Sequence, residues 1–158
     1  MPRPQTLADV ARIVQANPSE YAVPLDEFCD EFYLDHPDKA AQQCRIDPVP
    51  DSVGDELADA WIGAIGEHLA LRCGLRIPAW TQRAIHFALQ DPHFLPATKA
   101  MRGVVIVESP PSFRSRSIFT VVEPLVTPFF PPGVPRAKVP LEWPPPRETE
   151  EERKQRLG

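Results

Sequence analysis

The sequence predicts an all-α protein, a small irregular helical bundle that carries an extended, proline-rich C-terminal arm. Apolar residues recur at helical spacing through most of the chain, and proline often stands where such a pattern begins or ends. Proline is also concentrated late, because nine of the 23 residues from 124 to 146 are proline. That density excludes a helix or a central strand and favours polyproline II or disorder. We therefore divide the chain into a helical domain, residues 1–123, and an arm with a charged tip, residues 124–158.

Local signals mark three helices in the N-terminal part of the domain. Thr6 and Asp9 fit a capping box in front of an apolar stripe with helical spacing. Pro24 suits the first turn of a second helix, and the His36-Pro37 pair ends it because the residue before a proline disfavours helical dihedral angles. The expected helices span residues 6–17, 24–36 and about 38–45.

The strongest helical pattern runs from Asp51 to Cys73. Apolar side chains recur at every fourth position along it, and Gly74 stands where a left-handed C-cap belongs. Gly63 and Gly66 lie inside this helix, where each costs about 1 kcal/mol relative to alanine. Their presence predicts a closely packed neighbouring helix.

After Gly74 the chain is expected to turn and bring Ile77 and Trp80 back to the core. A further helix is predicted from Thr81 to Gln90, because an Asp-Pro pair follows directly and breaks it.

Residues 96–108 have two interpretations. The run 104–107 has the composition of a strand, whereas the residues before it favour helix. We predict a helix through Glu108, because a lone strand would have no partner elsewhere in the chain. Ser109 is then expected to cap a short helix with Pro110 in its first turn.

Composition favours a cytoplasmic protein. Hydrophobic residues make up 42% and charged residues 25%, which is typical of a globular domain. The sequence has no run of eighteen apolar residues and no basic segment followed by an apolar stretch at its start, so we expect neither a membrane span nor a secretory signal. Its three cysteines, an odd number without a Cys-x-x-Cys pair, fit a reducing compartment.

The net charge of −5 is unevenly distributed. Residues 1–60 carry 13 acids and 4 bases, residues 61–125 carry 4 acids and 7 bases, and residues 126–158 carry 5 acids and 6 bases. An acidic half repels a phosphate backbone, so binding to nucleic acid by this chain alone is not expected. It could instead meet a basic protein partner, or it could be a solvated face that keeps the protein in solution.

No set of residues predicts a metal site, a cofactor or catalysis. No Cys lies within four residues of another Cys or a His, and Cys44 and Cys73 are expected to be small buried side chains. Acidic neighbours raise the pKa of the Cys29 thiol, which is the wrong direction for a nucleophile. Without a glycine-rich loop or a nucleophile–base set, we predict that the protein is not an enzyme.

Two segments are candidates for binding a partner. In residues 109–119, aromatic anchors and forked guanidinium donors are the side chains that dominate interfaces. The alternative is that this segment closes the bundle while its arginines pair with the acidic N-terminal half. In the arm, three large aromatics on a polyproline background suit a groove on another protein, although a disordered tail or a strap over its own domain are alternatives. The candidate residues are Phe113, Arg114, Arg116, Phe119, Phe129, Phe130 and Trp143.

A further pattern links four separated segments, which are residues 54–57, 64–70, 74–80 and 108–119. Taken together, they resemble a family of small, largely uncharacterised bacterial helical proteins with the pattern GD…LAEHLA…GLPVPAW…SPAAFRRRGIF. Members of that family occur alone or behind a helix-turn-helix domain, and some of those that occur alone are encoded beside a nucleotidyltransferase-like protein, in the manner of a toxin–antitoxin gene pair. This chain differs in lacking a DNA-binding module, in the serines within its arginine cluster, and in its proline arm.

The sequence therefore predicts a non-catalytic protein-binding module. The resemblance implies an antitoxin-like partner that neutralises a nucleotidyltransferase-type toxin by steric blocking. In that hypothesis the helical core docks, the arm lies in the toxin's groove, and the acidic half faces basic residues. The alternatives are a nucleic-acid-linked regulator that uses Lys99, Arg102, Arg114 and Arg116, or an enzyme with an unrecognised helical active site.

Overall fold

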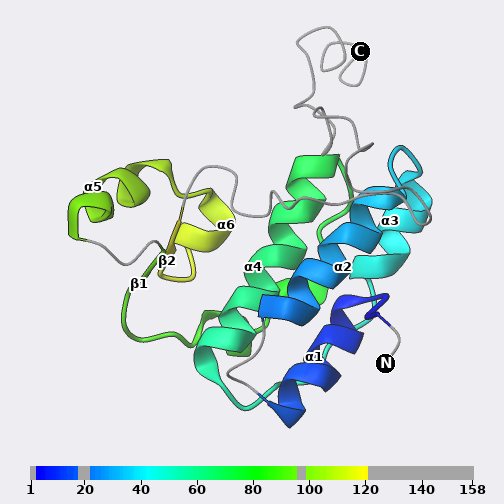
Figure 1. Cartoon of the computed structure of the whole chain (residues 1–158), viewed down its shortest axis with the longest axis horizontal. Coiled ribbons are helices and arrows are strands. Elements are labelled where there is room, and N and C mark those ends of the chain that lie inside the picture. Colours follow the sequence, from blue (N-terminus) through cyan, green and yellow to red (C-terminus); the bar gives the residue numbers. More distant parts are fainter. Residues whose placement is uncertain (1–2, 18–21, 96–98, 121–158) are drawn as a thin grey trace, which may run out of the picture.

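The computed structural model describes residues 3–17, 22–95 and 99–120 of the chain, and helices dominate this part (Figure 1). The predicted all-α fold class is confirmed. The α-helices are α1 (Leu7–Ala16), α2 (Ala22–Leu34), α3 (Lys39–Ile46), α4 (Glu56–Cys73), α5 (Lys99–Glu108) and α6 (Pro111–Arg114); the 3-10 helices are η2 (Ala79–Gln82) and η3 (Ala84–Phe87); the strands are β1 (His93–Phe94) and β2 (Ile118–Phe119).

The arm and its candidate residues Phe129, Phe130 and Trp143 lie outside the described residues. Within the described ranges, no helix combines the length and the apolarity that a membrane crossing requires.

The caps of the first helices agree with the sequence. The Thr6 hydroxyl accepts the Asp9 N–H at 3.1 Å, and the Asp9 carboxylate accepts the Thr6 N–H at 3.1 Å, which completes the predicted capping box of α1. At α3 the Asp38 carboxylate accepts the Ala41 N–H at 3.1 Å. These boundaries could be predicted because each depends on residues three or four positions apart.

The central helix α4 begins five residues later than its apolar pattern predicts. Gly54 has a left-handed backbone with φ of 79°, and Asp55 caps the helix by accepting the Ala58 N–H at 2.8 Å. The Asp59 carboxylate accepts hydrogen bonds from the Ser52 hydroxyl and the Val53 N–H, which holds the residues before α4 in a non-helical conformation. The predicted C-cap is confirmed, because Gly74 is left-handed with φ of 66°.

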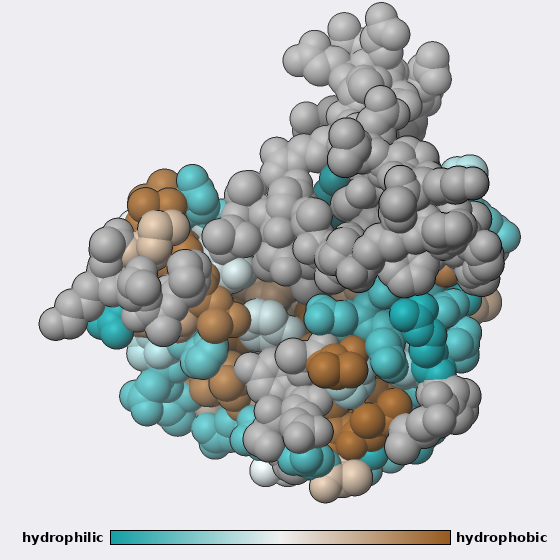
Figure 2. Space-filling view, in the orientation of Figure 1, coloured by the Kyte–Doolittle hydropathy of each residue, from teal (hydrophilic) through white to brown (hydrophobic). Residues whose placement is uncertain are grey.

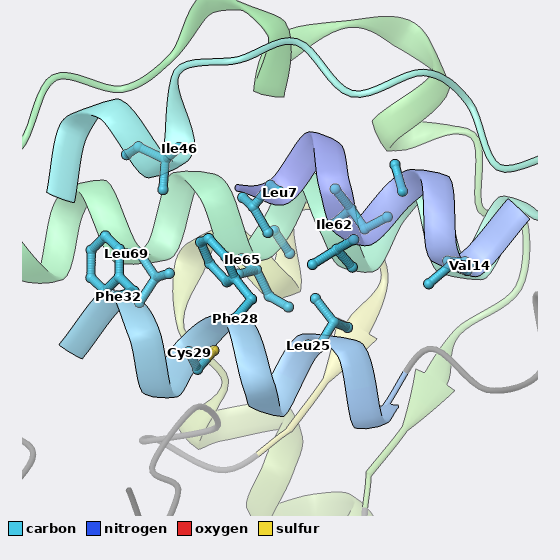
Figure 3. Close-up of a cluster of buried hydrophobic side chains, with 14 of the residues drawn as sticks. Leu7, Val14, Leu25, Phe28, Cys29, Phe32, Ile46, Ile62, Ile65 and Leu69 are labelled. Carbon is cyan, nitrogen blue, oxygen red and sulfur yellow. The ribbon is translucent and has the colours of Figure 1, made fainter. Parts of the chain in front are cut away.

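The main core lies between α1, α2 and α4. Leu7 of α1, Phe28 and Phe32 of α2, and Ile62 and Ile65 of α4 point into one apolar cluster (Figure 3) and are buried almost completely. Burying a side chain of this size contributes about 1.5–3 kcal/mol. This cluster accounts for the stability of the bundle and fixes α4 as the helix on which the rest of the chain packs.

The chain after α4 does not form the predicted helix from Thr81 to Gln90. It forms the two short 3-10 helices η2 and η3, both packed against α4. Arg83 separates them because its backbone is extended, with ψ of 149°. Both pack closely on the glycines of α4: a Cβ on Gly63 would lie 2.6 Å from the Cβ of His86, and one on Gly66 would lie 2.9 Å from the Trp80 ring. The neighbour predicted from these glycines therefore exists, but it consists of 3-10 turns.

The burial of the turn is only partly as expected. Trp80 is buried and its indole N–H donates to the Ile46 carbonyl at 2.8 Å, as its predicted return to the core requires. Ile77 remains 39% exposed, so its predicted burial is wrong. The Gln43 side chain binds both the N–H and the carbonyl of Arg76, the residue before Ile77. These two bonds hold the chain at the surface and keep Ile77 away from the core.

The acidic N-terminal part is partly neutralised within the chain. Arg3 reaches Asp30 at 3.5 Å and Glu31 at 3.2 Å, and Arg45 pairs with Asp35. Such pairs at a surface contribute about 0–1 kcal/mol each, so they mainly lower the local negative charge.

The last described residues form a separate group of elements beside the bundle, which we call the outer lobe (residues 93–95 and 99–120). Its strands β1 and β2 pair in parallel, with His93 opposite Ile118 and Phe94 opposite Phe119. Figure 1 shows α6 close to α4 and α5 farther out, on the far side of the strands. The helix predicted through Glu108 is confirmed as α5.

Candidate protein-interaction surface

Phe113, predicted as a partner-facing anchor, lies in the interior. Its side chain has no exposed surface, and its ring meets Trp61 and His68 of α4 edge-on at centroid distances of 5.6 and 5.4 Å. Aromatic pairs in this geometry contribute about 0.5–1.5 kcal/mol beyond the area they bury. Phe113 therefore anchors α6 to α4, and in this structure it offers no surface to a partner.

Arg116 is also buried, with its guanidinium enclosed by its own chain. It donates to Glu67 at 2.9 Å and to the carbonyls of Thr81 and Ser112, each at 2.7 Å, and it lies 4.1 Å above the Phe87 ring. Its Nε–H has no partner among the described residues. Arg116 thus joins α6, α4 and η2 at one point, and it does so as an internal charge.

The contact with Arg116 helps to lower the pKa of the Glu67 carboxyl group. Burial alone would raise its pKa, but hydrogen bonds from Gln82, Arg116 and Ser112 outweigh burial, so the pKa lies below its ordinary value. Glu67 is therefore ionised at neutral pH and balances Arg116. The predicted alternative, in which the arginines pair with the acidic residues 1–60, is wrong in its partner, because Glu67 lies outside that range and Arg114 binds backbone carbonyls.

Arg114 points the other way and is exposed. Its Nη2 donates to the carbonyls of Val107 at 3.0 Å and Ser109 at 2.8 Å, so it closes the carboxyl end of α5. A cation at this end of a helix meets unpaired carbonyls and the negative end of the helix dipole.

Ser109 does not cap α6 as predicted. Pro110 is the cap residue and makes no side-chain hydrogen bond. The Ser109 hydroxyl instead accepts the Thr120 N–H at 2.8 Å, and it lies within hydrogen-bond distance of the Val105 and Thr120 carbonyls. One buried hydroxyl thereby ties the end of α5 to the end of β2.

A short stack of aromatic rings supports the other end of α5. Phe94 of β1 and Phe119 of β2 stack with centroids 5.2 Å apart, and the Arg102 guanidinium lies 5.1 Å above the Phe94 ring. Phe119 is half-buried, so of the two aromatic candidates in residues 109–119 it alone retains some accessible surface.

The outward side of α5 is apolar and uncovered by the described residues. Val105 faces the lobe and is fully buried, whereas Val104, Ile106 and Val107 are 41%, 46% and 76% exposed. We call these three residues the α5 ridge. Figure 2 shows hydrophobic surface over α5, at the left of the molecule. Several exposed branched apolar residues on one short helix are typical of a surface that binds another molecule.

The α5 ridge was not among the binding surfaces predicted from the sequence. A signal existed, because four consecutive apolar residues from 104 to 107 point in all directions around a helix. They can all be buried only if the helix is surrounded on every side. A helix near the end of a small domain has too few neighbours for that.

The cysteine and histidine side chains of the described residues do not form one reactive cluster. Burial, with help from Asp26 and Asp30, raises the pKa of the Cys29 thiol. Cys44 is exposed and Cys73 half-buried, so the prediction that both are buried is wrong. In the described part of the chain, no group of three or more His, Cys, Asp or Glu residues could hold a metal ion.

His86 is buried and fixed in one neutral form. Its Nδ1 lies 2.7 Å from the Asp59 carbonyl and must donate, while its Nε2 lies 3.0 Å from Arg83 and must accept. Burial lowers its pKa, the bond to Asp59 raises it, and the charge of Arg83 lowers it further, with a net decrease. The Nδ1 contact holds η3 on α4, and the Nε2 contact binds Arg83, the residue that precedes η3.

Comparison of the chain with protein-family models, with curated proteins and with solved structures found no match. The function is therefore inferred from the site itself.

Proposed function

We propose that the protein is a non-catalytic binding module that recognises another protein through the outer lobe. The observation that carries this proposal is the α5 ridge, with Val107 as the most exposed large apolar side chain among the described residues. Binding a partner there would remove apolar surface from water, at about 25 cal/mol per Å² buried.

The way in which α5 is held supports the same proposal. Val105 is buried beneath it, Ser109 ties its end to β2, and Arg114 closes its last turn. A surface that is already ordered loses little conformational entropy when a partner binds.

A narrower proposal rests on the family resemblance of residues 54–57, 64–70, 74–80 and 108–119. In it, the partner is a nucleotidyltransferase-type toxin in the cytoplasm, and the module blocks it sterically. The acidic residues of α2 would face basic groups of the toxin. Asp26 suits this role, because it is an exposed carboxylate on α2.

The test is copurification of the tagged full-length chain from its native host, with two matched variants. Val107→Asp places a charge on the α5 ridge, while Leu71→Asp places the same charge on α4 at a side chain that is 55% exposed. We expect a stoichiometric companion protein with the wild-type chain and with Leu71→Asp, and its loss with Val107→Asp.

Two results would contradict the proposal. One is a companion that Val107→Asp does not affect. The other is recovery of nucleic acid that a high-salt wash removes, which would favour the nucleic-acid-linked regulator. The narrower proposal is tested by coexpression with a nucleotidyltransferase-like neighbour: growth should be restored by the wild-type chain and not by Val107→Asp.

A further inference from the structure

We infer that the α5 ridge binds an amphipathic helix of a partner protein, and that carboxylates flank the apolar stripe of that helix. The inference rests on the proposed function and adds the chemistry of the partner to it.

The shape of the surface fits a helix. Val104 and Val107 lie one helical turn apart and form a ridge, and Gly103 lies beside them on the exposed side. A Cβ placed on Gly103 would meet nothing within 4 Å, so the described residues leave this side of α5 open to close approach. A ridge beside an open, small position is how two helices pack together.

The charge around the ridge selects the partner. Arg102 is exposed on α5, and its guanidinium is oriented by the Phe94 ring. At the other end, Arg114 uses Nη2 for the α5 carbonyls, which leaves its Nε and Nη1 donors without a partner among the described residues. Arg102 and Arg114 are exposed and Glu108 is the single acid of the outer lobe, whereas Arg116 is buried against Glu67 and adds no exposed charge.

The bundle carries a negative charge, in contrast to the exposed arginines of the outer lobe. Residues 1–60 carry nine more acids than bases, from 13 acids and 4 bases. A helix of the partner that carries carboxylates is therefore repelled by the bundle and attracted to the outer lobe, which steers that helix toward the α5 ridge. A nucleic acid is a poorer fit, because the α5 ridge between these arginines is apolar and offers no hydrogen bonds to a phosphate backbone.

The experiment is an NMR titration of the isotopically labelled full-length chain with two synthetic helical peptides. Both peptides carry the same leucine stripe at positions i, i+3, i+4 and i+7; glutamates flank the stripe in one and lysines in the other. We expect the glutamate peptide to shift the amide signals of residues 99–108 and 114. We expect it to bind about tenfold more tightly than the lysine peptide at low salt, a preference of about 1.4 kcal/mol.

Two variants test whether Arg102 causes the preference for the glutamate peptide. Arg102→Gln should reduce the preference for the glutamate peptide several-fold, whereas Arg12→Gln, at an arginine of α1 whose side chain is 66% exposed, should leave it unchanged. Salt should reduce the preference as well, because exposed charges are screened beyond about 10 Å at 0.1 M ionic strength. Val107→Asp should abolish binding of both peptides.

Several outcomes would overturn the inference: equal binding of the two peptides, preference for the lysine peptide, or shifts confined to other elements. Sedimentation of the chain with vesicles of phosphatidylserine and phosphatidylcholine that Val107→Asp prevents would assign the surface to a membrane. A Val107-dependent dimer in analytical ultracentrifugation would assign it to a second copy.

The two proposals fail separately. If a companion from the host depends on Val107 but the peptides show no preference, the binding module stands and the acidic partner helix is wrong. If the companion does not depend on Val107, the proposed binding surface itself is wrong.

Discussion

α5 and α6 follow one another in the chain, yet one is built inward and the other outward. α6 places Phe113 within the core and directs the chain so that Arg116 follows it there, while α5 buries Val105 and exposes its other branched residues. The residue types suggest the opposite, since arginine is normally exposed and valine buried. The comparison shows that position in the fold decides the role: α6 lies against α4, and α5 lies beyond the strands (Figure 1).

The two arginines of α6 and the turn after it should differ most in their effect on stability. Arg116→Ala removes a donor from the Thr81 and Ser112 carbonyls and leaves the part-buried Glu67 carboxylate without its counter-charge, so we expect a loss of about 3–5 kcal/mol in the free energy of unfolding. Arg114→Ala removes two exposed hydrogen bonds and should cost about 0.5–1.5 kcal/mol. Urea unfolding followed by circular dichroism measures both.

Arg116→Lys keeps the charge without the fork, so it serves if Arg116→Ala does not fold. It should be intermediate, because an ammonium group cannot reach Glu67 and both carbonyls in the same planar arrangement. Equal losses for Arg114→Ala and Arg116→Ala would contradict the assignment of Arg116 as an internal tie.

Two glycines give a second comparison between the buried and the open side. Gly63→Ala brings a Cβ to 2.6 Å from the Cβ of His86, and the resulting shift of η3 should cost about 1–3 kcal/mol. Gly103→Ala meets no atom and should stabilise α5 by up to about 1 kcal/mol. Thermal unfolding should show opposite changes in midpoint, and a stable Gly63→Ala protein would mean that η3 does not pack as described.

The smallest expected effect is a change of stability with pH through His86. Its pKa is lowered in the folded chain, so between the unfolded value near 6.5 and the lower folded value the unfolded state binds the proton more readily. The stabilising contribution is complete above about pH 6.5 and is lost as the pH falls through this window. His86→Asn keeps a donor for Asp59 and does not titrate, so its unfolding free energy should fall less between pH 7 and pH 5 than that of the wild type.

Helix boundaries could be predicted where their cause is local. Thr6 with Asp9, Asp38 and Gly74 each act within a few residues of the boundary that they set. The helix through Glu108 was also predicted, but from the non-local premise that a strand at 104–107 would lack a partner, although the chain does form the strand pair β1 and β2.

The rest of the structure depends on contacts between distant residues. The 3-10 helices pack closely on α4 because Gly63 and Gly66 admit His86 and Trp80, and residues 79–87 alone do not contain that information. The burial of Arg116 requires Glu67, which lies 49 positions earlier. Of the candidate residues, Arg114 and Phe119 were placed at the surface correctly or in part, and the exposed side of α5 was not foreseen because its composition resembles a core.

The hydroxyl of Ser109 has a consequence for how the small sheet meets other chains. A short parallel pair of strands presents unpaired backbone groups at its edges, and such edges invite pairing with a strand from another molecule. Thr120, at the end of β2, has its N–H bound by the Ser109 hydroxyl and its carbonyl within reach of the same group. One side chain thereby occupies both backbone groups of Thr120, so neither is free to pair with a strand from another molecule.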